Sequence, residues 1–526
     1  MGYRGKPSAA CERCRFRRLR CNLARPSCAA CIRADIECGG YRDQPSLAIR
    51  DESEQTRQRY RQRKSPKKET RHPKPVPASA ASSPKDDQLV ASYSFPRTIN
   101  IHVKVLARDY LLSSYVDPRS RYMSYLAPLL GKCRSEGLDA AVTAVALASF
   151  SNIHASPNTM VKAHAEYASA LRQTNKALND AGQCATDQVL AAVIMLGMFE
   201  VVSCSDCGFV NRWMQHLDGA LRLLEIRDAN QLSRSEGLDM FRQLRTQLTI
   251  SCLYRDSHYF PILDKLNQHL ENYRLPDDKK NDELCAIMGG LVNLIADVEA
   301  GTLSNPGKII QSAIHVNAEM VSLMLAMPTG WNFTKMSVAD EQMRGHKVPA
   351  GVWGDTYHVY DNAAAMATWN HYRCGRMILN KLILDTLTKY DLPYNGSNTE
   401  SPLFSAAQRQ GLMILCQQTT AEMMLGVIAS VPFSLGSKAH DDVSTEVGCF
   451  GGLTLMWPLL LIAKTETATS ELRLWIAECL DKIGHGMGIA QALVTSKMVR
   501  EMVNGHLASS SWDFPSRDIE IGASAG

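Results

Sequence analysis

Residues 11–38 read CERCRFRRLRCNLARPSCAACIRADIEC, and the cysteines of this stretch decide how the N-terminus folds. Their spacing is C-x2-C-x6-C-x6-C-x2-C-x6-C, which divides them into two near-identical halves. Each half offers two thiolates one helical turn apart and a third after a short loop. A module of roughly 30 residues cannot hold itself together by apolar burial, so metal binding must supply its folding energy. The candidate metal ligands are Cys11, Cys14, Cys21, Cys28, Cys31 and Cys38.

The number of cysteines suits two zinc ions. Three ligands cannot complete the tetrahedral shell of a structural zinc ion, which takes four. Two zinc ions can each reach four ligands from six thiolates if two of the sulfurs bridge them. The segment has no histidine, which excludes a mixed Cys/His finger. Chance clustering and a ubiquitin-ligase ring are the weaker alternatives, since rings use wider central spacings and usually a histidine.

This cysteine pattern closely resembles the fungal binuclear zinc-cluster family of transcription factors. The residues between the cysteines agree as well, with a basic run around Phe16 and Leu19, Pro26 in the loop between the halves, and Gly40 and Tyr41 after the last cysteine. The resemblance implies that Cys11 and Cys28 are bridging thiolates and that the other four cysteines are terminal ligands.

The resemblance also implies how DNA is read. A short helix starting near Cys11 points its C-terminal end, near Arg17 and Arg18, into the major groove, where this pair reads a CGG-type triplet. The family commonly has lysine at the second position, but arginine can also donate two parallel hydrogen bonds to guanine. Other arginines, among them Arg13 and Arg25, are expected on phosphates. The predicted DNA-binding residues are Arg15, Arg17, Arg18 and Arg20.

Charge is distributed unevenly along the chain. Residues 1–74 hold 20 Lys+Arg against 8 Asp+Glu, whereas the remaining 452 residues hold 38 against 45. A basic N-terminus on a mildly acidic body is the electrostatic pattern of a protein that meets a polyanion. The sequence therefore predicts double-stranded DNA as a partner.

A polar, low-complexity stretch follows the cysteines and has almost nothing to bury, which predicts a disordered linker at 42–93. Its basic run at 57–68 is expected to be a nuclear localisation signal, with phosphate contacts or a solvated linker as alternatives. No heptad register links its few apolar residues, so no coiled coil is predicted and homodimerisation stays open. The signal residues are Arg61, Arg63, Lys64, Lys67 and Lys68.

From about residue 94, apolar residues recur at steps of three and four, which predicts helices and strand content near zero. Either Thr186 or Asp187 can accept hydrogen bonds from free amides where one helix starts. The predicted helices cover 138–150, 160–178, 189–202, 213–226 and 363–387.

The fold class is therefore predicted as mostly α. The domains expected are a metal-stabilised zinc cluster at 8–41, the flexible linker at 42–93, a large all-helical regulatory domain at 94–508 and a tail at 509–526.

The helical part resembles the fungal-specific transcription factor region, most clearly at 186–202 and 212–227, with 369–384 and 456–464 in support. The resemblance implies a regulatory module that carries no known reaction, sometimes responds to a small-molecule effector, and often controls biosynthetic gene clusters. No P-loop, GxGxxG behind a strand, HExxH or GxSxG occurs, so an enzyme is not predicted.

Other polar residues in this part are expected to be structural. Cys204 and Cys207 have redox spacing but are interpreted as loop cysteines. His216 is interpreted as a packed or surface histidine. Core positions are predicted for Cys252, Cys374, Cys416 and Cys479.

The hypothesis is a nuclear, sequence-specific transcription regulator that meets DNA and the transcription machinery. Neither a signal peptide nor a spanning helix is predicted, since the longest apolar run, 450–463, falls short of about 20 residues. Two alternatives stay open: a scaffold protein whose zinc module binds protein, and a metabolic enzyme with an appended zinc module.

Overall fold

The computed structural model describes residues 10–17, 19–40, 102–132, 135–206, 208–273, 278–389, 404–436 and 448–505. The contacts within the chain divide it into two compact units, residues 1–95 and 96–526. The expected linker with its localisation signal, the tail, Arg18 and Cys207 lie outside the described residues.

The first unit contains two short helices, α1 (Glu12–Phe16) and α2 (Ala29–Ile32). Of the side chains that the structure describes between residues 10 and 40, only four are buried, and all four are cysteines: Cys11, Cys14, Cys28 and Cys31. An apolar core is therefore lacking in this part, as the short sequence predicts.

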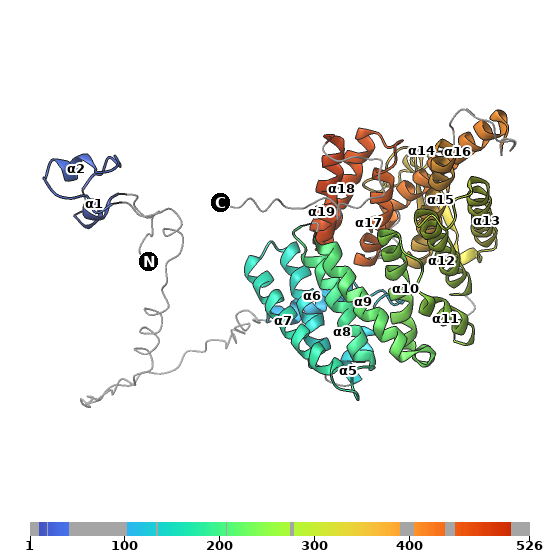
Figure 1. The fold of residues 1–526 in the computed structure, drawn as a ribbon, viewed down its shortest axis with the longest axis horizontal. Coiled ribbons are helices and arrows are strands. Elements are labelled where there is room, and N and C mark those ends of the chain that lie inside the picture. Colours follow the sequence, from blue (N-terminus) through green and yellow to red (C-terminus); the bar gives the residue numbers. More distant parts are fainter. Residues whose placement is uncertain are drawn as a thin grey trace, which may run out of the picture. The chain divides into compact units, whose positions relative to one another are not determined.

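The second unit is helical, and the predicted mostly-α fold class is confirmed (Figure 1). All five predicted helices are present, as α6, α7, α8, α9 and α15. Its α-helices are α4 (Val103–Ser114), α5 (Leu126–Lys132), α6 (Glu136–Ile153), α7 (Pro157–Leu178), α8 (Asp187–Ser203), α9 (Phe209–Arg227), α10 (Ser235–Arg255), α11 (Pro261–His269), α12 (Lys279–Glu299), α13 (Pro306–Leu325), α14 (Val338–Met343), α15 (Ala363–Lys389), α16 (Ala406–Ser434), α17 (Gly448–Ala463), α18 (Ser470–Met487) and α19 (Ala490–Val503). Short 3-10 turns are η2 (Ala229–Ser233), η3 (Leu270–Asn272) and η5 (Thr329–Trp331).

A small antiparallel sheet supplies the few strand residues of the described chain, in keeping with the predicted strand content near zero. Strand β1 (Phe333–Ser337) pairs with β2 (Thr356–Tyr360), with Phe333 opposite Tyr360 and Ser337 opposite Thr356. Aromatic and β-branched residues in β2 favour this pairing. Tyr357 and Tyr360 are buried, so the sheet is part of the core of this unit.

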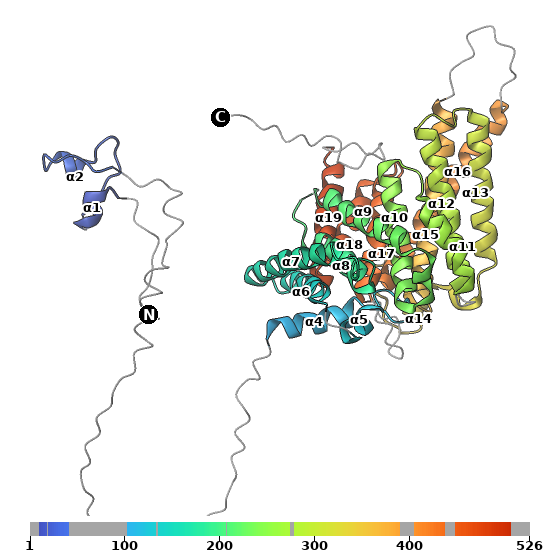
Figure 2. The same ribbon diagram turned by 60° about the horizontal axis from the view of Figure 1, so that its bottom comes forward.

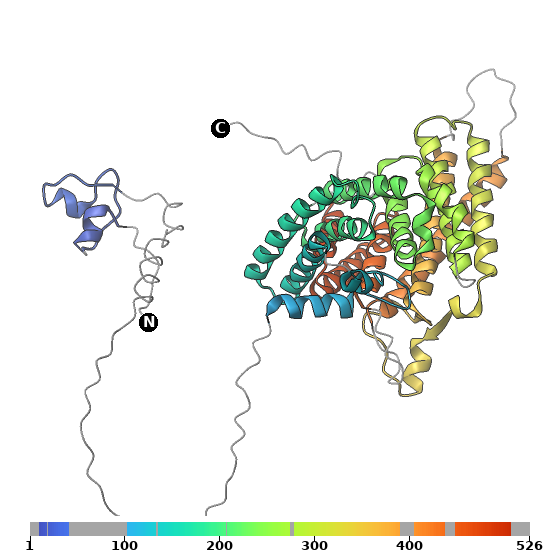
Figure 3. The same ribbon diagram turned by 90° about the horizontal axis from the view of Figure 1, so that it is seen from below.

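The helices of the second unit form two groups with α10 and α17–α19 between them (Figures 1, 2 and 3). In the first group α6 packs against α7 and α8, and α8 against α9. In the second, α15 packs against α13 and α16. The last helices return to the first group, because α18 contacts α6 and α19 contacts α8.

Helix α16 is long and apolar enough to cross a membrane by length and composition alone, a test that the core helix of a soluble protein also passes. Residues 427–434 at its C-terminal end are all buried. The helix packs against α15, α17 and β2. This end of α16 therefore belongs to the protein core.

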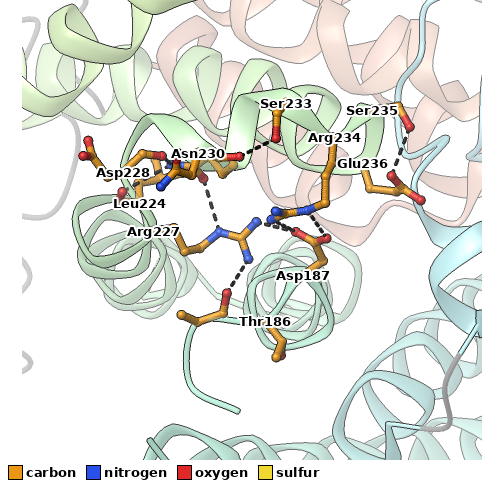
Figure 4. A network of polar contacts seen from close by, with 12 residues as sticks. Thr186, Asp187, Leu224, Arg227, Asp228, Asn230, Ser233, Arg234, Ser235 and Glu236 are labelled. Carbon is orange, nitrogen blue, oxygen red and sulfur yellow. Dashed lines mark hydrogen bonds and ion pairs between the residues drawn. The ribbon is translucent and has the colours of Figure 1, made fainter. Parts of the chain in front are cut away.

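The start of α8 differs from the prediction. The helix begins at Asp187 as expected, but Thr186 at its N-cap makes no side-chain capping bond. Instead, the Asp187 carboxylate accepts hydrogen bonds from Arg227 and from Arg234, whose Nε lies 2.9 Å away (Figure 4). Burial alone would raise the pKa of Asp187, but the bonds from the two guanidinium groups lower it. The carboxylate thus ties α8 to the end of α9 and the start of α10.

The turn after α18 fixes the C-terminal helices to α6. Gly488 ends α18 in the left-handed conformation, with φ 72°, and its carbonyl accepts a hydrogen bond from Asn152 Nδ2 at 2.9 Å. The carbonyl of Met487 accepts a bond of 2.9 Å from the Tyr115 hydroxyl. A Cβ on Gly488 would lie 2.5 Å from the carbonyl oxygen of Ser149. Both the conformation and the space therefore require glycine here.

We expect Gly488→Ala to lower the free energy of unfolding of the second unit. The left-handed backbone alone costs roughly 1–3 kcal/mol with a side chain, and the contact with Ser149 adds to it. Thermal unfolding followed by circular dichroism measures the effect. Gly486→Ala is the matched control, because nothing lies within 4 Å of a Cβ there, and an alanine inside a helix is stabilising by about 0.5–1 kcal/mol. Equal melting of both variants would contradict this account.

A buried arginine, Arg373 on α15, is held by neutral groups. Its Nη1 donates hydrogen bonds of 2.8 Å to the Tyr360 hydroxyl and to Asn370 Oδ1. Its Nη2 lies 3.3 Å from Nδ1 of His358, and the Phe333 ring lies 5.2 Å from the guanidinium. Burial, together with the charge of Arg373, lowers the pKa of His358 from 6.5 to about 3. His358 is therefore neutral in the folded protein.

The free energy of unfolding should fall as the pH drops from about 7 towards 4. The unfolded chain protonates His358 near its ordinary pKa of 6.5, whereas the folded chain does so only near pH 3, so protons favour unfolding between these values. The variant His358→Gln should weaken this dependence by up to about 1.4 kcal/mol per pH unit. Melting curves at several pH values measure it, with His315→Gln as the control at a side chain that is 75% exposed.

Candidate metal centre and nucleic-acid interface

The six N-terminal cysteines form two overlapping groups of four sulfur atoms. Within each group the sulfurs all lie within 4.8 Å of one another. Cys11 and Cys28 belong to both groups, and their sulfurs are 3.7 Å apart. Cys14 and Cys21 complete one group, and Cys31 and Cys38 complete the other.

These distances fit tetrahedral zinc. With zinc–sulfur bonds of about 2.3 Å, two sulfurs of a tetrahedral shell are about 3.8 Å apart. The distance from Cys11 Sγ to Cys31 Sγ is 3.8 Å, and that from Cys14 Sγ to Cys28 Sγ is 3.7 Å. Two groups of four that share two members are what six thiolates need to surround two zinc ions.

The two halves fold alike because their sequences repeat with an offset of 17 residues, the separation of Cys11 and Cys28. Each of these cysteines immediately precedes a short helix. The amide of Leu19 donates to the carbonyl of Cys14 at 2.9 Å, and in the second half the amide of Ile36 donates to that of Cys31 at 3.2 Å. Equivalent turns thus present equivalent sulfurs.

A few polar contacts join the halves. Arg13 Nη1 donates to the carbonyl of Ala30 at 3.2 Å, and the amide of Ala29 donates to Asn22 Oδ1 at 3.0 Å. The sequence pointed to phosphate contacts for Arg13 and did not reveal this contact between the halves. Nothing in the spacing of the residues indicates which arginine turns towards the other half.

The thiols differ in acidity. Burial raises the pKa of Cys14 to about 11. Backbone hydrogen bonds from Cys11 and Leu23 lower the pKa of Cys21 to about 6. Zinc binds thiolates, so metal binding must draw protons from the buried sulfurs as well.

Basic residues are concentrated in the sequence between and around the cysteines. Residues 10–40 hold seven arginines and three acidic residues. Arg17, in the turn that follows α1, is exposed, as are Arg20 and Arg25. The backbone of Arg15 lies in α1, and Arg18 is outside the described residues. Phe16 is 89% exposed between these arginines, an apolar surface that the sequence interpretation did not use.

Two protein-family models match this chain. "Fungal Zn(2)-Cys(6) binuclear cluster domain" matches residues 9–47, and "Fungal specific transcription factor domain" matches residues 99–298. The chain thus combines the zinc-cluster domain and the helical domain of fungal transcription factors. This zinc-cluster factor is thus a DNA-binding transcription regulator, and its cluster domain binds two zinc ions. Comparison with curated proteins gave no match, and neither did comparison with solved structures.

The second family model, for the transcription factor domain, covers only part of the helical unit. The zinc-cluster factor continues beyond residue 298 into β1, β2 and α13–α19. The resemblances expected at 369–384 and 456–464 fall in that later part, on α15 and α17.

The other cysteines considered from sequence are buried wherever the structure describes them, and the histidine is packed against neighbouring side chains. Cys204 is buried in the loop between α8 and α9. His216 Nε2 lies 3.1 Å from the Tyr167 hydroxyl, which donates to buried Glu200 at 2.7 Å, so the prediction of a packed histidine is confirmed. The predicted core positions are confirmed for Cys252, Cys374, Cys416 and Cys479.

The zinc-cluster factor should contain two zinc ions per chain, and Cys14→Ala should reduce this number and unfold the first unit. The reason is that Cys14 belongs to one four-sulfur group and the other cysteines cannot replace it. Metal analysis by mass spectrometry measures the zinc. Cys184→Ala, a partly exposed cysteine far along the chain, is the control and should keep both ions. Two ions retained in Cys14→Ala would refute the assignment.

Proposed function

We propose that this zinc-cluster factor reads short CGG-like triplets in the major groove of DNA. The six cysteines hold the two zinc ions, with Cys11 and Cys28 as the bridging thiolates. The observation that carries the proposal is the pair of four-sulfur groups that share these two cysteines, with an arginine-rich turn directly after α1. Zinc supplies the folding energy that holds α1 and this turn in place.

The arginines have two roles in this proposal. Arg17 and Arg18 donate to guanine O6 and N7, which specifies the triplet. Arg15, Arg20 and Arg25 contact phosphates, which positions the unit on the duplex without reading the sequence. Two zinc ions and six thiolates carry a net charge of −2, so the arginines also offset the charge of the cluster.

The cellular setting is part of the proposal. The factor acts in the nucleus, brought there by the basic residues between 61 and 68, and meets the transcription machinery at RNA polymerase II genes. Architectures of this kind often control specialised-metabolite gene clusters, which makes such a cluster the proposed target. No reaction is assigned to the helical unit. A zinc module that binds protein is the competing function.

Salt dependence separates DNA binding from protein binding. The full-length factor should bind duplex DNA with an affinity that falls by about 0.9 log units per log unit of salt for each phosphate contacted. Fluorescence anisotropy with a labelled duplex at several salt concentrations measures this slope. A zinc module that binds protein would show little duplex affinity at any salt concentration.

Arg18→Ala should reduce discrimination between a CGG-containing duplex and a random one, by about 1–3 kcal/mol for one bidentate arginine–guanine pair. Binding to random DNA should weaken much less. Arg25→Ala is the matched control, since loss of a phosphate contact weakens both duplexes alike and lowers the salt slope by about one. Equal losses on both duplexes in Arg18→Ala would rule out a base-reading role for this residue.

A further inference from the structure

The helical unit contains an open cavity of about 490 Å³ that the DNA-binding function does not use. Its walls come from α8 and α9 of the first helix group, α12 and α15 of the second, and α10, α17 and α19 between them. The cavity thus lies where the two groups meet. Its volume is in the range of small-molecule sites, about 300–1,000 Å³.

One face of α10 forms a long wall of the cavity. Asp239, Arg242, Thr246, Ile250 and Tyr254 all line it at steps of three and four residues, so they share one side of the helix. Opposite walls come from equivalent faces of α15 and α17. Along α10 the lining changes from charged side chains to apolar and aromatic ones.

At the charged end of the cavity, near the start of α10, ion pairs hold the side chains in place. Asp278, at the start of α12, lies 2.9 Å from Arg121 Nη1 and 3.0 Å from Arg242 Nη1. Asp239 accepts a hydrogen bond of 2.6 Å from the Ser124 hydroxyl. Burial raises the pKa of Asp239. These groups are fixed by one another and leave a polar surface facing the cavity.

Two hydrogen-bond donors next to each other on α10 lack partners among the described residues. Gln243 is only 8% exposed, and its Oε1 accepts from the Tyr125 hydroxyl at 3.1 Å, but its Nε2 is unpartnered. The Nε of Arg242 is also buried and unpartnered. Buried polar groups are nearly always hydrogen-bonded, and both residues line the cavity, so these two donors can serve an acceptor from outside the chain once their side chains turn towards it.

Aromatic side chains line much of the rest of the cavity. Trp213, Trp331, Trp457 and Phe450 contribute to the walls. His371 also lines the cavity, and burial together with the charge of Arg245 lowers its pKa to about 4, so its ring is neutral. Flat apolar surfaces of this kind favour a flat, apolar ligand.

We propose that this cavity binds a flat, largely aromatic small molecule whose carbonyl-type oxygen accepts hydrogen bonds from Gln243 and Arg242. The apolar body of the ligand lies among the tryptophan side chains, and its oxygen lies at the start of the polar end. That this molecule is the effector of a transcription regulator rests on the proposed function. The presence of the binding site does not, because none of its residues belongs to the first unit.

Nile red, a flat aromatic ketone whose fluorescence rises in apolar surroundings, is a suitable probe for the full-length protein. We expect saturable binding with one site per chain. Thr246→Phe fills the cavity and should weaken binding at least about tenfold. Thr388→Phe is the matched control, because Thr388 is exposed on α15 and its hydroxyl bonds the carbonyl four residues earlier, as that of Thr246 does.

A second variant tests the hydrogen bond. Gln243→Glu keeps the oxygen that Tyr125 needs and removes the Nε2 donor, so affinity for Nile red should fall about tenfold, the effect of one buried hydrogen bond. Circular dichroism checks that each variant is folded, and Ala367→Phe on the opposite wall replaces Thr246→Phe if that variant unfolds.

Binding that does not saturate at one site, or that Thr246→Phe and Thr388→Phe weaken alike, would overturn the proposal by placing the dye on exposed apolar surface. Unchanged affinity in Gln243→Glu would overturn the role of the orphan donor. No DNA is present in these measurements, so their failure is distinct from a failure of DNA recognition.

Discussion

Sulfur atoms shared between two metal sites are the constraint on which the DNA-binding unit depends. Cys11 and Cys28 belong to both four-sulfur groups, so neither half of the sequence can complete a zinc shell without the other. The buried side chains described in this unit are cysteines, and no apolar core could replace them. In the proposed function, metal coordination therefore positions the turn after α1, and DNA recognition in turn depends on zinc.

The helical unit is held together in a different way, by apolar burial and by contacts between distant parts of the chain. Its last helices return to its first ones, where Gly488 and Met487 meet Asn152 and Tyr115. The match to the transcription factor domain ends at residue 298, but the folded unit continues beyond it, because α18 contacts α6 and α19 contacts α8. The cavity between the two helix groups exists only once the whole unit has folded, which makes it a natural place for a ligand to act on the unit as a whole.

What the sequence could predict was local. The cysteine spacing lies within 28 residues and points to the cluster, and the apolar periodicity placed α6, α7, α8, α9 and α15. The five-residue strands β1 and β2 were missed because so short a pattern does not stand out from irregular structure. Capping by Thr186 or Asp187 was predicted wrongly, because Thr186 makes no capping bond and the Asp187 carboxylate binds Arg227 and Arg234, 40 and 47 residues away. The cavity draws on seven helices, and no single stretch of sequence encodes it.

The most direct test of the central claim is selection of bound sequences from a random duplex pool by the full-length protein, with and without a zinc chelator. We expect enrichment of a CGG-like triplet that chelation abolishes, because zinc holds the reading turn in place. One or two enriched half-sites would also show whether the protein binds as a monomer or a dimer. No enrichment from protein that holds both zinc ions would contradict the account and favour a zinc module that binds protein.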